Sequence, residues 1–469
     1  MALGVIEPCG TNSPEGPKDN GKDITPRLSN DGISLKIINA KDRHDAENQK
    51  VIDGDAHFHR LGWKRLAVIL VVESIALGSL GLPYAFATLG MVAGVILCIG
   101  VGLVAMYASY VIGRVKVKYP HVAHYSDIGP LLMGKFGGVL FDAIFVSQIT
   151  LLVASHCLTG TIAFTTITES NICPIIFGVV SAIIMLILAI PPTFTDMAIL
   201  GYIDFASIIL AIGITMIATG IQGAHMPGGL GASTWSAWPK EGVTFSEAIS
   251  SLNAIVFAYA FAGAQPTFMD EMHTPKDYVK SIWVLGFLEI VIYTLTGSII
   301  YFFVGQGVQS PALLSAGPLF SRVVFGVALP VIFISGSINI TVVARYVHGR
   351  IYKDSAVRYV NTRKGWITWL GLVVLVSIVS WFISEAIPFF PELLSLSASL
   401  FVSGLSFYFP PVMWWHLLKE GGWYDKRNLR SAMYNIVVFI VGLAILGCGT
   451  YSSVVELVSF KLSTLKYFD

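Results

Sequence analysis

The sequence predicts an all-α polytopic membrane protein with eleven transmembrane helices. Two observations on composition predict this class: 54% of the residues are hydrophobic and only 13% are charged, whereas about a quarter of the residues in soluble domains carry a charge. The third observation is a series of apolar runs, most of them close to the ~20 residues that cross a bilayer. The formal net charge of +1 gives no indication of nucleic-acid binding, so the expected surroundings are the lipid bilayer.

Residues 1–60 are polar, and we expect them to form a disordered cytoplasmic tail that could contact trafficking or ubiquitination machinery. Trp63 then suits the headgroup layer at the entry to the membrane. The apolar runs that follow are predicted to be transmembrane spans, in order Leu66–Leu89, Met91–Val111, Val139–Thr165, Ile175–Ile190, Ala198–Ile221, Ala248–Thr267, Ser281–Val304, Pro318–Val347, Trp366–Ile383, Leu393–Leu417 and Met433–Tyr451.

The basic residues beside the spans predict the orientation of the chain. The loops after the second, sixth, eighth and tenth spans carry most of the flanking lysines and arginines, whereas the alternate loops carry little beyond Lys240. Because cytoplasmic loops are enriched in Lys and Arg, these four loops are expected to be cytoplasmic. This places the N-terminus inside and the C-terminus outside.

The first span contains residues that a plain membrane anchor would avoid, namely Gly78, Ser79, Gly81 and Pro83. Glycine costs about 1 kcal/mol in a helix interior, and proline costs about 3 kcal/mol or more. Such a segment is a candidate discontinuous helix whose open backbone holds a substrate or an ion at the membrane midplane. The alternative interpretation is a kinked or closely packed helix, since Gly and Pro are frequent in membrane spans.

The sixth span repeats this feature, with Gly263 and Pro266 inside an apolar segment. It lies five spans after the first, and a block of five helices is odd in number, so the second block inserts upside down. Two inverted five-helix repeats, each opening with a broken helix, form a leucine-transporter-type arrangement with the site at the repeat interface. We therefore divide the chain into residues 61–225 and 226–420 as the two repeats, and residues 421–469 as an eleventh helix with an extracellular C-terminus.

The motifs around both interruptions resemble those of the amino acid/auxin permease family, and within it the fungal neutral amino acid permeases of the methyltryptophan-resistance type. The resemblance rests on the segments 77–86 (LGSLGLPYAF), 257–266 (FAYAFAGAQP) and 270–276 (DEMHTPK), and it covers about residues 60 to 452. It implies secondary active transport of amino acids, usually driven by protons, although some relatives use sodium or reside in the vacuolar membrane.

An amino acid substrate brings a carboxylate and an ammonium group into the membrane. Unwound backbone amides in the first span are donors suited to the carboxylate, and unwound carbonyls in the sixth span are acceptors suited to the ammonium. The absence of an ionic partner for a charged side chain near either interruption favours a neutral substrate. The candidate substrate-binding residues are Gly78, Ser79, Leu80, Gly81, Tyr259, Ala260, Phe261 and Gly263. The two aromatic ones could face an apolar substrate side chain, although aromatic residues at such spacing are more often packing residues.

Ionisable residues inside spans are candidates for coupling because each is costly in hydrocarbon. Glu73 lies about one turn before the first interruption and Asp204 lies in the fifth span, so either carboxyl is a candidate proton carrier, with Glu73 preferred. A carboxylate permanently hydrogen-bonded to a neighbouring helix is the alternative for each. The oxygen donors Ser337, Asn339 and Thr341 in the eighth span, with Ser335 beside them, are a possible ion site or else ordinary interhelical hydrogen-bonding groups.

Three further ionisable residues lie in or near spans. His156 is expected to be a packing histidine, whereas Glu289 and Asp142 are expected to lie near the cytoplasmic boundary and to reach water. The ten histidines are scattered and the five cysteines show no paired metal spacing, so neither an enzyme nor a metal centre is indicated.

The sequence thus predicts a secondary active transporter, expected to be a proton-coupled symporter that imports neutral aliphatic and aromatic amino acids across the plasma membrane by alternating access. No cofactor is expected, and the coupling ion is expected to be H⁺. The alternatives are a vacuolar amino acid exchanger, a sodium-coupled transporter and a transporter-like nutrient sensor.

Overall fold

The computed structural model describes residues 61–192, 194–225, 229, 233–353, 355–360 and 362–465, all within one compact unit that spans residues 50–469. The predicted tail of residues 1–60 lies outside the described residues.

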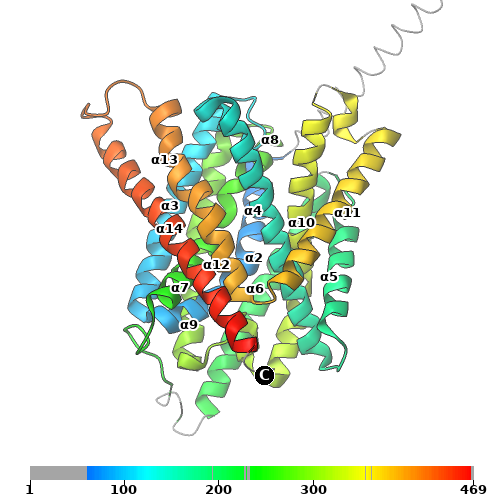
Figure 1. The fold of residues 1–469 in the computed structure, drawn as a ribbon, viewed down its shortest axis with the longest axis vertical. Coiled ribbons are helices and arrows are strands. Elements are labelled where there is room, and N and C mark those ends of the chain that lie inside the picture. Colours follow the sequence, from blue (N-terminus) through cyan, green and yellow to red (C-terminus); the bar gives the residue numbers. More distant parts are fainter. Residues whose placement is uncertain are drawn as a thin grey trace, which may run out of the picture. The chain divides into compact units, whose positions relative to one another are not determined.

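The described residues are almost entirely helical (Figure 1), with one isolated bridge between Leu61 and Met272. The α-helices are α2 (Trp63–Leu89), α3 (Met91–Lys118), α4 (Ile128–Thr168), α5 (Pro174–Leu188), α6 (Phe194–His225), α7 (Phe245–Ala258), α8 (Gln265–Asp270), α9 (Tyr278–Val304), α10 (Pro318–Ile351), α11 (Arg363–Ala386), α12 (Phe390–Ser397), α13 (Phe409–Met413) and α14 (Leu429–Leu465). Short 3₁₀ segments are η1 (Tyr125–Asp127), η3 (Ala260–Gly263), η4 (Pro275–Asp277), η5 (Gly305–Gly307), η6 (Ala312–Ala316) and η7 (Ala356–Tyr359), and two π-helical segments are η8 (Ala398–Tyr408) and η9 (Trp414–Leu418).

Each of the eleven predicted spans overlaps a helix or a run of helical segments. In the described part of the chain, eight helical segments are long and apolar enough to cross a membrane, and α5 and α7 are shorter apolar helices. The all-α membrane fold is confirmed. The count of eleven crossings, the orientation and the boundaries of the two repeats stay predictions.

The helices differ in how much of their surface other helices cover. In α10, 72% of the most apolar window is buried, and in the run from α12 to η9 the share is 78%, whereas in α3, α11 and α14 it is 33%. The first two segments are therefore interior, and the other three expose a broad apolar surface of the kind that lipid covers. Figure 1 shows α14 crossing the bundle diagonally, where it packs along η8 and α12.

Local sequence explains where several helices begin and end. Thr244 caps α7 through a reciprocal pair of hydrogen bonds with Glu247, each 3.1 Å long. Gly90 forms the turn between α2 and α3 with a φ of +84°, and a Cβ there would lie 2.4 Å from the backbone of Trp238. α4 begins at Ile128, earlier than the predicted Val139, because it continues through a kink at Gly134.

Candidate functional site

The sixth predicted span is interrupted at the predicted place. α7 ends at Ala258, Tyr259 departs from helical geometry with a φ of −101° and a ψ of 34°, and the 3₁₀ turn η3 leads into the short helix α8. Pro266 lies in the first turn of α8, where a missing N–H costs no helical hydrogen bond. The prediction of a broken helix here is confirmed.

The first predicted span is one continuous helix, so the expected interruption was wrong. α2 runs from Trp63 to Leu89 with Pro83 inside it. Proline has no N–H to donate to the carbonyl one turn back, which belongs to Ser79, but the loss of a single bond does not end a helix whose neighbours pack tightly against it. The backbone amides of Ser79, Leu80 and Gly81 therefore lie inside a helix and not in an unwound segment, and the alternative of a closely packed helix is the one observed.

A small central cavity lies where α2, α4 and the α7–η3 interruption meet. Its lining residues are Ser74, Gly78, Leu152, His156, Phe257, Ala258, Ala260 and Phe261. Its volume is about 10 Å³, close to the least space that holds one water molecule. An amino acid enters such a site only when the surrounding helices separate.

Three of the predicted substrate-binding residues line this cavity together, namely Gly78, Ala260 and Phe261. α2 and α7 pack closely at Gly78, where an added Cβ would lie 2.7 Å from the Cα of Ala258. Only glycine therefore fits at this crossing, and the sequence motif places it there.

The other five predicted residues are buried nearby but do not line the cavity. Ser79 donates its hydroxyl to the carbonyl of Ile75 on its own helix at 3.0 Å, and Leu80 is 1% exposed. The Tyr259 hydroxyl donates to the carbonyl of Cys98 on α3 at 2.9 Å. An added Cβ at Gly81 would meet the Leu394 side chain at 3.1 Å, and one at Gly263 would meet the Leu405 side chain at 3.0 Å.

A group of hydrogen bonds that the sequence analysis did not predict connects α9 to α2 and α7. The Ser74 hydroxyl donates to the Glu289 carboxylate, and the Tyr293 hydroxyl lies 2.7 Å from the carbonyl of Ser74 and 2.9 Å from that of Ala258. Glu289 is fully buried, so the expectation that it reaches water was wrong. The signal in the sequence was the spacing of Glu289 and Tyr293, which puts both side chains on one face of a helix.

His156 connects the cavity to α10. Its Nδ1 lies 2.9 Å from the carbonyl oxygen of Ile332, and because a carbonyl only accepts hydrogen bonds, Nδ1 carries the proton. The ring is fully buried and bonded to α10, as expected for a packing histidine, but it also lines the cavity.

Asp204 of α6 lies against α10, also fully buried, and accepts a hydrogen bond of 2.9 Å from the Ser335 hydroxyl. The structure thus brings together a candidate proton carrier and the oxygen-rich part of the eighth predicted span. The other three residues of that cluster donate hydrogen bonds to backbone carbonyls of their own helix. Ser337 donates to the carbonyl of Ile334, Asn339 to that of Ser335 and Thr341 to that of Ser337. Glu73 belongs to α2, but its side chain lies outside the described residues.

Ion pairs fasten the short helix α8 at the end remote from the central cavity. Asp270 at the end of α8 pairs with Lys116 of α3 at 2.6 Å, and Glu271 pairs with Arg345 of α10. The chain before α2 joins the same place, because the N–H of Leu61 donates to the carbonyl of Glu271 at 2.8 Å. We call this end of the bundle, where Lys116 and Arg345 lie, the basic side.

A second, larger cavity of about 420 Å³ opens at the basic side. Its lining includes His121, His124 and His348 together with Arg345 and Glu271. This cavity is large enough for an amino acid. It lies beside α8, because Asp270 at the end of that helix is among its lining residues.

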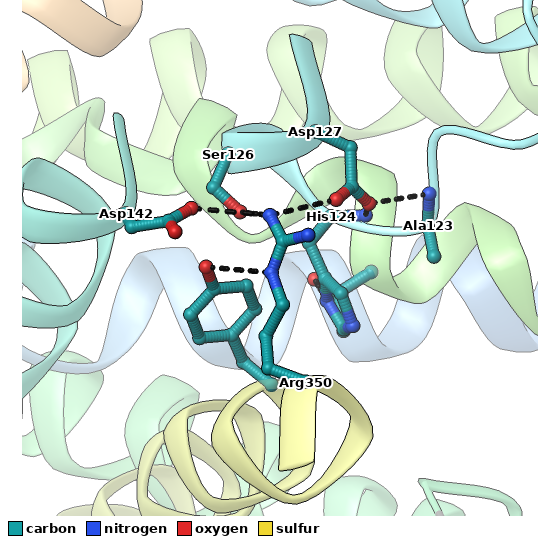
Figure 2. Close-up of polar contacts among 8 residues, drawn as sticks. Ala123, His124, Ser126, Asp127, Asp142 and Arg350 are labelled. Carbon is teal, nitrogen blue, oxygen red and sulfur yellow. Dashed lines mark hydrogen bonds and ion pairs between the residues drawn. The ribbon is translucent and has the colours of Figure 1, made fainter. Parts of the chain in front are cut away.

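Arg350 at the end of α10 pairs with two aspartates, one in η1 and one in α4 (Figure 2). Its guanidinium Nη2 lies 3.0 Å from Asp127 and 3.1 Å from Asp142, while Nε donates to the Tyr346 hydroxyl. Asp127 also accepts hydrogen bonds from the N–H groups of Ala123 and His124. The expectation that Asp142 reaches water agrees with its 40% exposure.

Comparisons with known proteins show which family and which relatives this chain resembles. The family described as "Transmembrane amino acid transporter protein" matches residues 59–455. The "N amino acid transport system protein" of Neurospora crassa is 54% identical over 407 residues, which cover 86% of this chain and 87% of that protein. A "Transmembrane transporter" of Fusarium pseudograminearum is 26% identical over 424 residues, covering 90% and 89% of the two chains.

Two solved structures share the fold at low sequence identity. MhsT in complex with L-phenylalanine matches with a TM-score of 0.51 at 14% identity, covering 84% of this chain and 98% of that chain. A nucleobase-cation-symport-1 family transporter in a closed conformation, with bromovinylhydantoin bound, matches with a TM-score of 0.50 at 13% identity, covering 85% and 91%. Both are leucine-transporter-type folds, so the predicted arrangement is confirmed at the level of the fold.

The matched family and relatives are transporters and not enzymes, in agreement with the sequence analysis. The family match covers nearly all of the chain from the first predicted span to the last, and it includes the motifs on which the sequence resemblance rested. The chain belongs to the transmembrane amino acid transporter family.

Proposed function

We propose that this protein is a proton-coupled symporter that imports neutral aliphatic and aromatic amino acids across the plasma membrane by alternating access. Family membership supports amino acid transport. Substrate class, coupling ion, direction and membrane go beyond it, and each is argued below.

The lining of the central cavity supports a neutral substrate. Leu152, Phe257 and Phe261 are apolar, and the polar groups that line it are the hydroxyl of Ser74 and the imidazole of His156. A charged substrate side chain would be costly among such groups. An apolar side chain gains free energy there by leaving water.

The burial of Asp204 is the observation that carries the proposal of proton coupling. Its carboxyl lies in the membrane-spanning part of α6 and is bound by Ser335 of α10. A carboxylate in hydrocarbon is costly, and a proton removes that cost, so such a group takes up and releases a proton as its surroundings change. Glu73 stays the second candidate.

Sodium coupling is the weaker alternative. A sodium site needs several oxygen atoms converging on one point. Ser337, Asn339 and Thr341 donate to carbonyls of their own helix, which is the usual arrangement of small polar residues in membrane helices, and the buried Asn339 Oδ1 is the oxygen of this group that has no hydrogen-bond partner among the described residues.

The two cavities support alternating access. The central cavity is nearly closed, and the larger cavity lies at the basic side, which the lysine and arginine distribution assigns to the cytoplasm. Helix α8, which follows the interruption, is short and is held at its end by two ion pairs, so breaking these pairs would release it when the site opens inward.

The test is uptake of radiolabelled leucine, phenylalanine, glutamate and lysine into proteoliposomes, with proton and sodium gradients imposed separately. We expect a proton gradient alone to concentrate leucine and phenylalanine but not glutamate or lysine. Accumulation driven by sodium alone would contradict proton coupling. Binding of amino acids without any flux would favour the sensor, and localisation of a tagged protein in its native cells distinguishes the plasma membrane from the vacuole.

Asp204→Asn tests the carrier, because it keeps size and hydrogen bonding but removes the titrating group. We expect the variant to lose accumulation while it retains leucine-for-leucine exchange, which moves no net proton. One proton moving through about 100 mV supplies about 2.3 kcal/mol, so accumulation should fall roughly forty- to fiftyfold. Ser335→Ala removes the hydrogen bond to this carboxyl but keeps the titrating group, so it separates loss of the bond from loss of the proton. Full accumulation by Asp204→Asn would exclude this carboxyl and leave Glu73 and the fully buried Glu289 as candidates.

A further inference from the structure

The imidazole of His156, which lines the central cavity, has one nitrogen in a hydrogen bond and one without a hydrogen-bond partner among the described residues. Nδ1 donates to the carbonyl of Ile332 at 2.9 Å, which fixes the position of its proton. Nε2 is buried and has no hydrogen-bond partner among the described residues. Buried polar atoms are nearly always paired, so an unpaired one in a cavity lining indicates a ligand that completes the pair.

The protonation of the ring decides what Nε2 can bind. With the proton on Nδ1, Nε2 of the neutral ring carries a lone pair and accepts a hydrogen bond. A second proton would place a charge beside Leu152, Phe257 and Phe261, which line the same cavity. The ring therefore offers an acceptor and not a donor.

The position of His156 is set by close packing of α4 on α10. An added Cβ at Gly336 would lie 3.1 Å from the Cβ of His156 and 2.3 Å from the sulfur of Met185. Glycine at this position lets the two helices approach, and the bond to Ile332 then holds the ring. A ring held in this way is pre-organised for a directional contact.

We propose that Nε2 of His156 accepts a hydrogen bond from the α-ammonium group of the amino acid substrate. The inference rests on the neutral amino acid transport proposed above, and it is independent of the coupling ion. An α-amino acid offers N–H donors only at its ammonium group, unless its side chain adds some, so the acceptor distinguishes amino acids from carboxylic acids of the same shape.

Two substitutions separate the two ring nitrogens. The amide of His156→Asn lies near the position of Nδ1 and can keep the bond to Ile332, but nothing replaces Nε2. The amide of His156→Gln reaches the position of Nε2 and can supply an acceptor there. Both variants are assayed by leucine exchange in proteoliposomes without an imposed gradient, so that a failure of proton coupling does not affect the result.

The readouts are the KM for leucine and the inhibition constant of 4-methylpentanoate, which is leucine without its amino group. Hydrogen bonds to charged groups are the stronger ones, so His156→Asn should raise the KM for leucine roughly ten- to hundredfold. The inhibition constant of 4-methylpentanoate should not change, and His156→Gln should stay within a few-fold of the parent for both compounds. Equal losses for both compounds, or no loss for His156→Asn, would overturn the inference.

A measurement on the unchanged protein covers the case in which a variant fails to fold. Diethyl pyrocarbonate modifies unprotonated imidazole nitrogen, and mass spectrometry reads the modification of the peptide that contains His156. We expect leucine to slow this modification and 4-methylpentanoate not to slow it. Modification at the same rate with and without leucine would overturn the inference, whereas a parent protein that exchanges no amino acid would overturn the proposed function instead.

Discussion

Gly78 is the position at which the size of one side chain decides whether α2 and α7 can meet. A Cβ there would lie 2.7 Å from the Cα of Ala258, and backbone cannot move aside as a flexible side chain can. At Gly81, three residues on, an added Cβ would meet side chains instead, the tip of Leu394 at 3.1 Å and the Cβ of Ala254 at 3.9 Å. The two glycines of one motif therefore differ in how well they tolerate a larger side chain.

We expect Gly78→Ala to destabilise the protein by about 1–3 kcal/mol through overpacking and to abolish uptake, because the helices that form the cavity move apart. Uptake of labelled leucine and the melting temperature of purified protein measure the two effects. Gly100→Ala in α3 is the matched control, since no atom lies within 4 Å of an added Cβ there. Normal leucine affinity in Gly78→Ala would show that the crossing is not needed for the site.

At the scale of elements, α8 depends on its neighbours for its position. It has six residues, too few for a helix to be stable in isolation. The ion pairs of Asp270 with Lys116 and of Glu271 with Arg345 attach its end to α3 and α10. The side chains of Glu271 and Arg345 are only 1% and 13% exposed, so removing one partner leaves a buried charge without that counter-ion.

Arg345→Met should therefore destabilise the protein by about 3–5 kcal/mol, and the double variant Arg345→Met with Glu271→Met should recover most of this loss. Thermal unfolding in detergent measures both. Lys280→Met is the control, because the pair of Lys280 with Asp277 is exposed and should contribute at most about 1 kcal/mol. A double variant no more stable than Arg345→Met would mean that the ion pair is not the reason for the loss.

His124 lies just before α4 and contacts α8 through the Thr267 hydroxyl, 2.9 Å from its Nδ1. Burial lowers the pKa of His124 below its ordinary value of 6.5, with Asp127 and Asp270 opposing the shift. The unfolded chain then binds a proton more readily than the folded one. The stability that the neutral ring contributes is thus complete above about pH 6.5 and is lost as the pH falls below it.

We expect the melting temperature of the parent to fall between pH 7 and pH 5, and to fall less in His124→Asn, which cannot take up the proton. Differential scanning fluorimetry at constant ionic strength measures this. Equal slopes for the two proteins would assign the pH dependence to other groups.

At the scale of the whole molecule, the prediction that joins all the helices is the topology. Basic residues in four separate loops predict that the N-terminus lies inside and the C-terminus outside. A tag at the C-terminus should therefore be reached by antibody in intact cells, and a tag near Lys353 should be reached only after the membrane is opened. A C-terminal tag found inside would show that the number of crossings is even.

The sequence by itself determined the class, the extents of most helices and the position of the second interruption. Long apolar runs are costly to expose to water, and Gly263 with Pro266 disfavours a continuous helix. The sequence also supplied Gly78, Ala260 and Phe261 as cavity residues, because the two motif segments that carry helix-breaking residues meet at this cavity.

Only the tertiary structure decided whether Pro83 breaks α2, and which polar groups face the cavity. A proline inside a helix costs a limited amount, and contacts with neighbouring helices offset that cost, so propensity alone predicts the interruption wrongly. Glu289 and His156 are single ionisable residues in apolar runs. Their contacts with Ser74 of α2 and Ile332 of α10 join helices that are far apart in the chain, which no local pattern encodes.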